Sequence, residues 1–485
     1  KSDLDKFSAR YEARAIRPWL ANLSVTGYYQ RQDRTLENRV PVQFPAPAAT
    51  FFPINVLRLD VLSFTEQQVW TPGVDIQAVI VPARNHLLTS GATTYRDRSE
   101  DERYTETATS LVGQVVLGPR GPQAVVLPQR QALGPPVVGR PVRVPNATFR
   151  DIGFFVQDEW KLRSNLSVVG GVRGDLYTVR TETTPGYDVA SLVAGAHPTI
   201  DPSTLPAPGG ATYNRNALTG DLGVIGSPDG RLSPYVRVGR SYRHPNLEEL
   251  LFAGPATAGN IIPNITVKPE TGNNFDAGTK FAIGSWTGGA FFFLNHYANF
   301  IASELVIAQT AAGPLTRATN FANVRIHGLE LQAQKPFVVG PGVVTINVTG
   351  AFMRGTVTDG ANPLDASSLA GTPADNITPS KVTANVRYTE SGARWWAEYG
   401  IRAQGQVNRV ALTVLDSPFL IAQDLLALDG FAVQRLGGGI RFGSGRHRAA
   451  ITFGLENLTD RYYREQFQFA PARGRSFTIG VRVGN

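Results

Sequence analysis

Cysteine is absent from the 485-residue sequence, and methionine occurs only once. The lack of cysteine excludes disulfide bonds, thiol nucleophiles and thiolate metal sites. No run of about 18 apolar residues occurs, so the sequence predicts no transmembrane helix. The mean hydropathy of −0.13 still leaves room for membrane strands, in which only every second residue is apolar.

Acidic residues are outnumbered, and the formal net charge is +8. The arginines are scattered along the chain rather than massed in one basic patch, so we expect no nucleic-acid partner. G-x-S-x-G, H-E-x-x-H and phosphate-binding glycine motifs are missing as well. The sequence therefore predicts neither an enzyme nor a bound cofactor.

The chain starts at Lys1, without an initiator methionine or a signal peptide. Export by the usual route needs such a peptide, so we expect a processed or trimmed chain if the protein is exported.

Glycine (49) and proline (33) are plentiful, and they punctuate segments in which apolar and polar residues alternate. Phe292, Leu294, Ala298 and Phe300, for example, alternate with polar neighbours. A period of two is typical of a strand with one apolar face. The pattern predicts seventeen strands: 4–13, 21–29, 74–81, 87–95, 153–162, 166–177, 218–225, 232–242, 273–283, 289–301, 324–334, 343–355, 381–390, 394–406, 431–442, 447–458 and 476–483.

The predicted connections alternate between short turns and long loops. A polar, proline-containing loop is expected up to about Leu57, and the two longest loops at 98–146 and 181–216. Bacterial outer-membrane barrels have this asymmetry, with short periplasmic turns and long extracellular loops. The fold class predicted is all-β, an antiparallel transmembrane β-barrel.

Three ordered motifs resemble those of the TonB-dependent outer-membrane receptors. RHPNLEEL at 243–250, Lys268-Pro269-Glu270 and Asp276-Ala277-Gly278 match that family's R-x-P-N-L-x-E-L, P-x-L-x-P-E and E-x-G segments. The strand at 153–162 is similar to the family's F-x-Q-D-E-W strand, and the tail contains N-L-T-D at 457–460 and G-R-S-F at 474–477. The chain departs from the family by ending on Val-Gly-Asn rather than an aromatic residue.

The resemblance implies a 22-stranded barrel, and single-chain bacterial barrels have an even number of strands. Residues 1–485 would then be the barrel without its first five strands, the plug domain and the segment that engages TonB. The implied function is TonB-coupled uptake of a scarce iron compound, a siderophore chelate or haem. The implied partners are the TonB–ExbB–ExbD complex, through the missing N-terminal region, and the lipid and lipopolysaccharide of the outer membrane.

A second interpretation is a structural or interaction barrel that does not transport. Two chains together could also form such a barrel. The coding sequence upstream of Lys1 discriminates between them, because a transporter needs a plug and a TonB-binding segment there.

Binding residues are expected at the mouth of the barrel. Arg243 could bind a propionate or another carboxylate through bidentate hydrogen bonds, Tyr242 could stack on a haem ring, and His244 could ligate its iron. Haem-receptor relatives usually have alanine where this chain has His244. The alternative for His244 is a solvated loop histidine, and no other metal ligand is predicted.

Basic residues recur on the predicted inner face, among them Arg173, Arg237, Arg402 and Arg441. They could attract an anionic cargo. The simpler interpretation is that they pair with acidic neighbours and with the plug, as buried charges require. The lipid face should carry Val168, Val172, Ile346, Val348, Ile451, Phe453, Ile479 and Val481.

Overall fold

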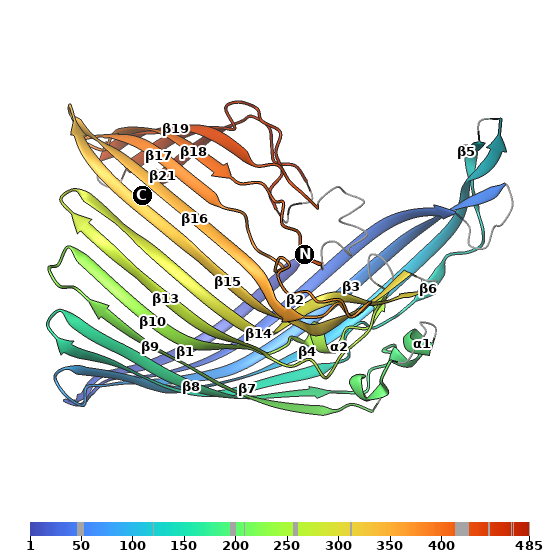
Figure 1. The fold of residues 1–485 in the computed structure, drawn as a ribbon, viewed down its shortest axis with the longest axis horizontal. Coiled ribbons are helices and arrows are strands. Elements are labelled where there is room, and N and C mark those ends of the chain that lie inside the picture. The colour runs from blue at the N-terminus through green and yellow to red at the C-terminus, as the bar shows by residue number, and fades with distance from the viewer. Residues whose placement is uncertain are drawn as a thin grey trace.

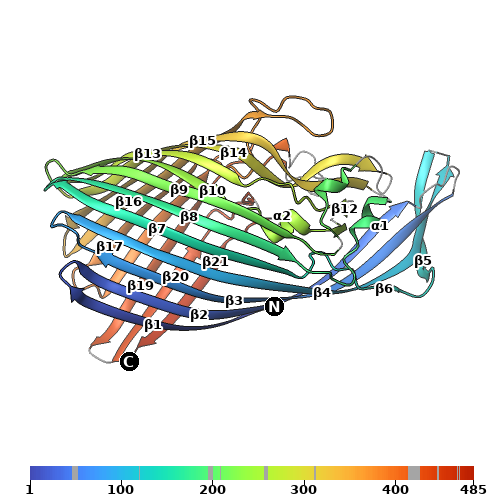
Figure 2. The ribbon, with the colours of Figure 1, turned by 90° about the horizontal axis from the view of Figure 1, so that it is seen from below.

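A computed structural model of the chain describes residues 1–45, 53–119, 121–194, 200–207, 209–255, 260–310, 313–412, 426–444, 447–466, 468 and 470–484. These residues form one large sheet, which curves along its whole length (Figures 1 and 2). Every pairing between its long strands is antiparallel. Within the described residues, no helix has both the length and the apolar character needed to cross a membrane.

The long strands match the seventeen predicted ones in order. They are β1 (Ser2–Arg17), β2 (Leu20–Pro45), β3 (Ile54–Ile80), β4 (His86–Gly118), β7 (Ala147–Arg163), β8 (Leu166–Thr181), β9 (Thr212–Gly226), β10 (Leu232–Arg243), β13 (Glu270–Ile283), β14 (Trp286–Thr310), β15 (Gly313–Val339), β16 (Gly342–Gly360), β17 (Lys381–Glu390), β18 (Trp395–Gln404), β19 (Phe431–Ser444), β20 (His447–Glu456) and β21 (Ser476–Gly484).

The remaining elements are short and lie in the connections. They are β5 (Gly121–Ala132), β6 (Val137–Gly139), α1 (Val189–Ala194), the 3-10 turn η1 (Pro202–Thr204), α2 (Leu247–Leu251), β11 (Gly254–Pro255) and β12 (Asn260–Ile261). Each long strand pairs with its neighbours in chain order, so the sheet is a simple meander. Among the described residues, β1 pairs only with β2 and β21 only with β20.

One end of the sheet carries tight turns, and the other carries the helices and long connections (Figure 1). The glycines at the turn positions 284 and 340 have positive φ angles of 60° and 55°, which suit a residue without a side chain. The asymmetry predicted from the sequence is therefore present. We call the end with α1 and α2 the mouth.

Several strands run farther than predicted toward the mouth. β2 continues to Pro45 and β3 begins at Ile54, where the sequence suggested a loop. The predicted long loop 98–146 is wrong in its first half, because β4 continues to Gly118 and pairs with β5. Beyond a membrane neither face of a strand meets lipid, so the apolar alternation fades. The β-branched residues that favour strands nevertheless persist there.

The two faces of the sheet differ as predicted. Ile451, Phe453, Ile479 and Val481 are apolar side chains that are 44–69% exposed, as the predicted lipid face requires. Buried apolar side chains lie instead near the mouth. One cluster comprises Val144, Ala147, Val179, Leu250, Leu251, Val267, Ile301 and Ala318. The apolar core of this protein thus fixes the loops of the mouth.

Candidate functional site at the mouth

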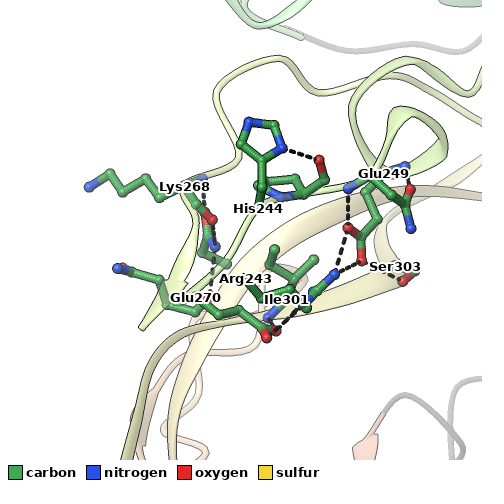
Figure 3. A network of polar contacts seen from close by, with 11 residues as sticks. Arg243, His244, Glu249, Lys268, Glu270, Ile301 and Ser303 are labelled. Carbon is green, nitrogen blue, oxygen red and sulfur yellow. Dashed lines mark hydrogen bonds and ion pairs between the residues drawn. The ribbon is translucent and has the colours of Figure 1, made fainter. Parts of the chain in front are cut away.

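Arg243, the last residue of β10, is the centre of a polar network (Figure 3). Its Nε and Nη2 donate to the two oxygens of Glu270 at 2.7 and 3.0 Å, and its Nη1 donates to both oxygens of Glu249 at 3.0 and 2.9 Å. Both glutamates are more than nine-tenths buried. The pair with Glu270 is bidentate, and the pair with Glu249 shares one nitrogen between two oxygens. Both are charge-assisted, which is the strong kind of hydrogen bond.

The same two carboxylates bind the surrounding backbone. Glu270 Oε1 accepts from the backbone N–H of Ile301 at 2.8 Å, and Glu249 Oε1 accepts from Ser303 Oγ at 3.3 Å. Glu249 also accepts from the backbone N–H of Asn246, whose side chain caps α2 in return. One guanidinium thereby joins β10, α2, β13 and β14.

His244 follows Arg243 directly, so this network sets its position. Its Nδ1 lies 2.5 Å from the carbonyl oxygen of Pro245. A carbonyl only accepts, so Nδ1 carries a proton, and in the neutral ring Nε2 keeps its lone pair. Burial lowers the pKa of His244 below its ordinary value, which favours the neutral, ligating form of the imidazole.

Aromatic rings surround this histidine. Tyr242 stacks on Tyr177 with ring centroids 5.7 Å apart and planes 5° apart. The His244 ring lies 5.4 Å from Tyr177 and 5.6 Å from Phe149, and Phe149 in turn lies 6.0 Å from Tyr95. The strands β4, β7, β8 and β10 thus present a continuous aromatic group at the mouth.

A hollow of about 680 Å³ lies next to this group. Tyr242 and Tyr297 line it with the polar groups of Arg173, Arg237 and Asp276. The mixture of rings, hydrogen-bonding groups and charges suits an organic molecule with polar substituents. Among the described residues, no group of three or more histidine, aspartate or glutamate side chains has the arrangement of a metal site.

The family model "TonB dependent receptor-like, beta-barrel" matches residues 1–458. The chain belongs to the TonB-dependent receptor β-barrel family. Barrels of this family are outer-membrane proteins of Gram-negative bacteria, and this receptor barrel is accordingly an outer-membrane protein.

Solved structures share its fold at low sequence identity. A "Copper transporter OprC" aligns with a TM-score of 0.67 and 18% identity over 99% of this chain. The FrpB iron transporter from Neisseria meningitidis gives 0.53 and 13%, covering 99% of this chain and 72% of its own, and the siderophore receptor PiuA from Acinetobacter baumannii gives 0.52 and 11%, covering 99% and 74%. The receptor barrel spans 65% of the first of these chains. No curated protein has a significant sequence match.

The structure brings Tyr242, Arg243 and His244 together at the mouth. The guanidinium of Arg243 is already directed at two glutamates, so the part it plays in this structure is to hold the loop. Its predicted contact with a ligand carboxylate stays a prediction, and so does the role of His244 as a haem ligand. The sequence analysis missed Phe149 and Tyr177 as site residues. The register of Tyr177 on the predicted strand 166–177 was a usable signal, whereas Phe149 precedes the predicted strand 153–162 and belongs to β7 only in the structure.

The other predicted inward arginines mostly pair with acidic neighbours. Arg173 contacts Asp175 at 2.5 Å and Arg237 contacts Asp221 at 3.0 Å. Arg402 donates to Glu465 at 2.8 Å and to the hydroxyl of Tyr463 at 3.1 Å. These three arginines thus have acidic partners within the chain, and pairing with the plug stays a prediction.

Arg441 is exposed, and the described residues offer its side chain no ion pair.

Proposed function

We propose that the receptor barrel is the membrane part of an active importer of a scarce iron compound, a siderophore chelate or haem. Energy would come from TonB–ExbB–ExbD, whose partnership is typical of the family. The cargo would bind at the mouth, against Tyr177, Tyr242 and His244. This binding role is not enzymatic.

The observation that carries the proposal is the aromatic group beside the hollow. A chelated metal is recognised through its organic ligand, by stacking and hydrogen bonds, and both kinds of group are present there. A naked metal ion would need a cluster of ligands instead.

A similar structure bears the name of a copper transporter, so copper is the second candidate. Soft thiolate and thioether ligands select reduced copper. This chain has no cysteine, and its single methionine, Met353, is an inner residue whose sulfur accepts from Thr378 Oγ1 at 3.4 Å. The ligand supply in this chain therefore favours a chelate or haem over a copper ion.

The test is uptake by cells that express the full-length protein. We expect iron-55 supplied as haem or as a ferric siderophore to accumulate, and the accumulation to vanish when tonB is deleted. If neither haem nor any of the ferric siderophores tested is taken up in a TonB-dependent way, the proposal is contradicted and the non-transporting barrel is favoured.

Haem and siderophore are separated by a titration of the purified full-length protein with haem. If haem is the cargo, a Soret band shift appears in the wild type and is lost in His244→Ala. His296→Ala is the matched control, since His296 lines the outward surface with Leu294 and Phe275. No haem binding in the wild type would leave the siderophore as the cargo.

A further inference from the structure

An acidic patch lies on the inner surface, next to the aromatic group. We define it as Asp75, Asp97, Asp151 and Asp175, with Arg173 at its edge. Strand pairing places these residues in four adjacent cross-strand rows over β2, β3, β4, β7 and β8. The rows are Gln30–Thr71–Asp97–Phe149–Val179, Tyr28–Gly73–Tyr95–Asp151–Tyr177, Thr26–Asp75–Thr93–Gly153–Asp175 and Ser24–Gln77–Gly91–Phe155–Arg173.

Arg173 cannot neutralise this patch. Its guanidinium contacts Asp175 at 2.5 Å, Thr93 Oγ1 at 2.9 Å and Asp151 only at 3.8 Å. Asp151 is 4% exposed, and its Oδ1 is buried without a hydrogen-bond partner. A buried carboxylate oxygen in that state is costly, because nothing replaces the water it has lost.

The other two carboxylates are half-buried and can be reached. Asp97 accepts only a hydroxyl hydrogen bond, from Thr71 at 2.6 Å. For Asp75 the described part of the chain offers neither an ion pair nor a hydrogen bond.

Within these rows four carboxylates face one guanidinium. The adjoining strands add Lys6, whose Nζ lies 5.7 Å over the Tyr28 ring, Arg10 of β1 and Arg215 of β9. Among the described residues, none of these three forms an ion pair with the four aspartates, so Asp75 and Asp97 stay unpaired.

Phenol rings flank these carboxylates. Tyr95 and Tyr177 are the cross-strand neighbours of Asp151, and Tyr28 lies across Gly73, where a Cβ would fall 2.2 Å from its ring. Only glycine leaves room for that ring to lie flat against the wall. Aromatic faces next to carboxylates attract cations by two additive effects, Coulomb attraction and cation–π contact.

We propose that the acidic patch binds one organic cation, an ammonium or guanidinium group, and that the cargo carries it. This inference rests on the proposed import function and narrows the substrate class to iron chelates with a protonated amine. Asp75 and Asp97 contact the cation, and Asp151 and Asp175 set the negative potential beneath it. An organic cation is favoured over a metal ion because the described residues offer no metal-type cluster.

The first arm of the test measures the cation site alone. Calorimetry on the purified full-length protein compares N-acetylargininamide with N-acetylcitrullinamide, which has the same shape without the charge. We expect the charged probe to bind about tenfold more tightly. The difference should disappear in the double variant Asp75→Asn, Asp97→Asn and persist in Asp359→Asn, an exposed control. Equal binding of the two probes would overturn the proposal.

The second arm identifies the source of the cation. A linear ferric trihydroxamate with a free terminal amine is compared with its N-acetylated form. Tighter binding of the free amine, again abolished in the double variant, supports a cation from the cargo. Equal binding, with a positive first arm, would overturn that source and assign the cation to another segment of the protein.

The two failures can be told apart. The import function fails if cells show no TonB-dependent iron uptake, even when the charged probe binds. The cation site fails if the probes bind equally, even when uptake is normal.

Discussion

The inner surface carries two patches of opposite charge whose charges are balanced to different degrees. The acidic patch has four aspartates and one arginine. Across β17, β18 and β19, four cross-strand rows contain Lys381, Arg387, Arg402 and Arg435 with the single carboxylate Glu398. We call these five residues the basic patch. The basic patch has four cations and one carboxylate, which is the reverse of the acidic patch.

The basic patch nevertheless satisfies its arginines. Arg435 contacts Glu398 at 2.5 Å, Arg387 lies 4.0 Å over the Trp396 ring, and Arg402 reaches Glu465 on a connecting segment. In the acidic patch, Asp75 and Asp97 have no cationic partner among the described residues. The two patches show that the unpaired charges of an inner wall decide which ions it attracts. A count of arginines predicts an anion-attracting surface, whereas the unpaired charge of the acidic patch is negative.

The largest effect on stability is expected from the network around Arg243 at the mouth. Arg243→Ala leaves Glu249 and Glu270 buried without their cation, which should lower the free energy of unfolding by about 3–5 kcal/mol. Urea unfolding in lipid vesicles measures it. Arg240→Ala is the control on the same strand, since among the described residues the Arg240 side chain forms no ion pair or hydrogen bond. Equal losses would mean that the network around Arg243 does not hold the mouth.

The next prediction tests whether the acidic and basic patches lie on the inner face of the sheet. Ile451→Arg on the outward face of β20 should cost about 2–4 kcal/mol near the membrane midplane. Thr452→Arg should cost less, because the neighbouring position faces inward. The same unfolding assay compares them, and similar costs would show that the two faces were assigned wrongly.

The smallest effect is a dependence of the protein's stability on pH, through His244. Burial lowers the pKa of His244 in the folded protein below the ordinary 6.5. The stability contributed by the neutral ring is therefore complete above pH 6.5 and is lost as the pH falls through the lower, folded-state pKa. Unfolding at stepped pH should show this loss in the wild type and a smaller one in His244→Gln. Identical pH profiles for the wild type and His244→Gln would contradict a lowered pKa of His244 in the folded protein.

The strands could be predicted because lipid forces a strict alternation. Ile479 and Val481 follow it, and so do the other strands that cross the membrane. The extension of β4 to Gly118 could not be predicted, since no membrane imposes a period there. Distinct physical environments thus set the limit of the sequence analysis.

Parts of the site were predictable and parts were not. The motif at 243–250 marked the mouth, and the Asn246–Glu249 spacing is a readable helix cap. The stacking of Tyr242 on Tyr177 joins residues far apart in the chain, so it depends on strand register. The pairing of Arg243 with Glu270 depends on that register in the same way.

The most direct measurement of the central claim uses the absence of cysteine. Two variants each receive a single cysteine, which is labelled with a fluorophore. Gln157→Cys lies beside the acidic patch, and Gln332→Cys lies beside Lys381 and Arg402 of the basic patch. A ferric chelate quenches a nearby fluorophore. The account predicts that the amine-bearing chelate quenches the label at position 157 more strongly than the label at 332, at the same chelate concentration. Equal quenching, or stronger quenching at 332, would contradict it.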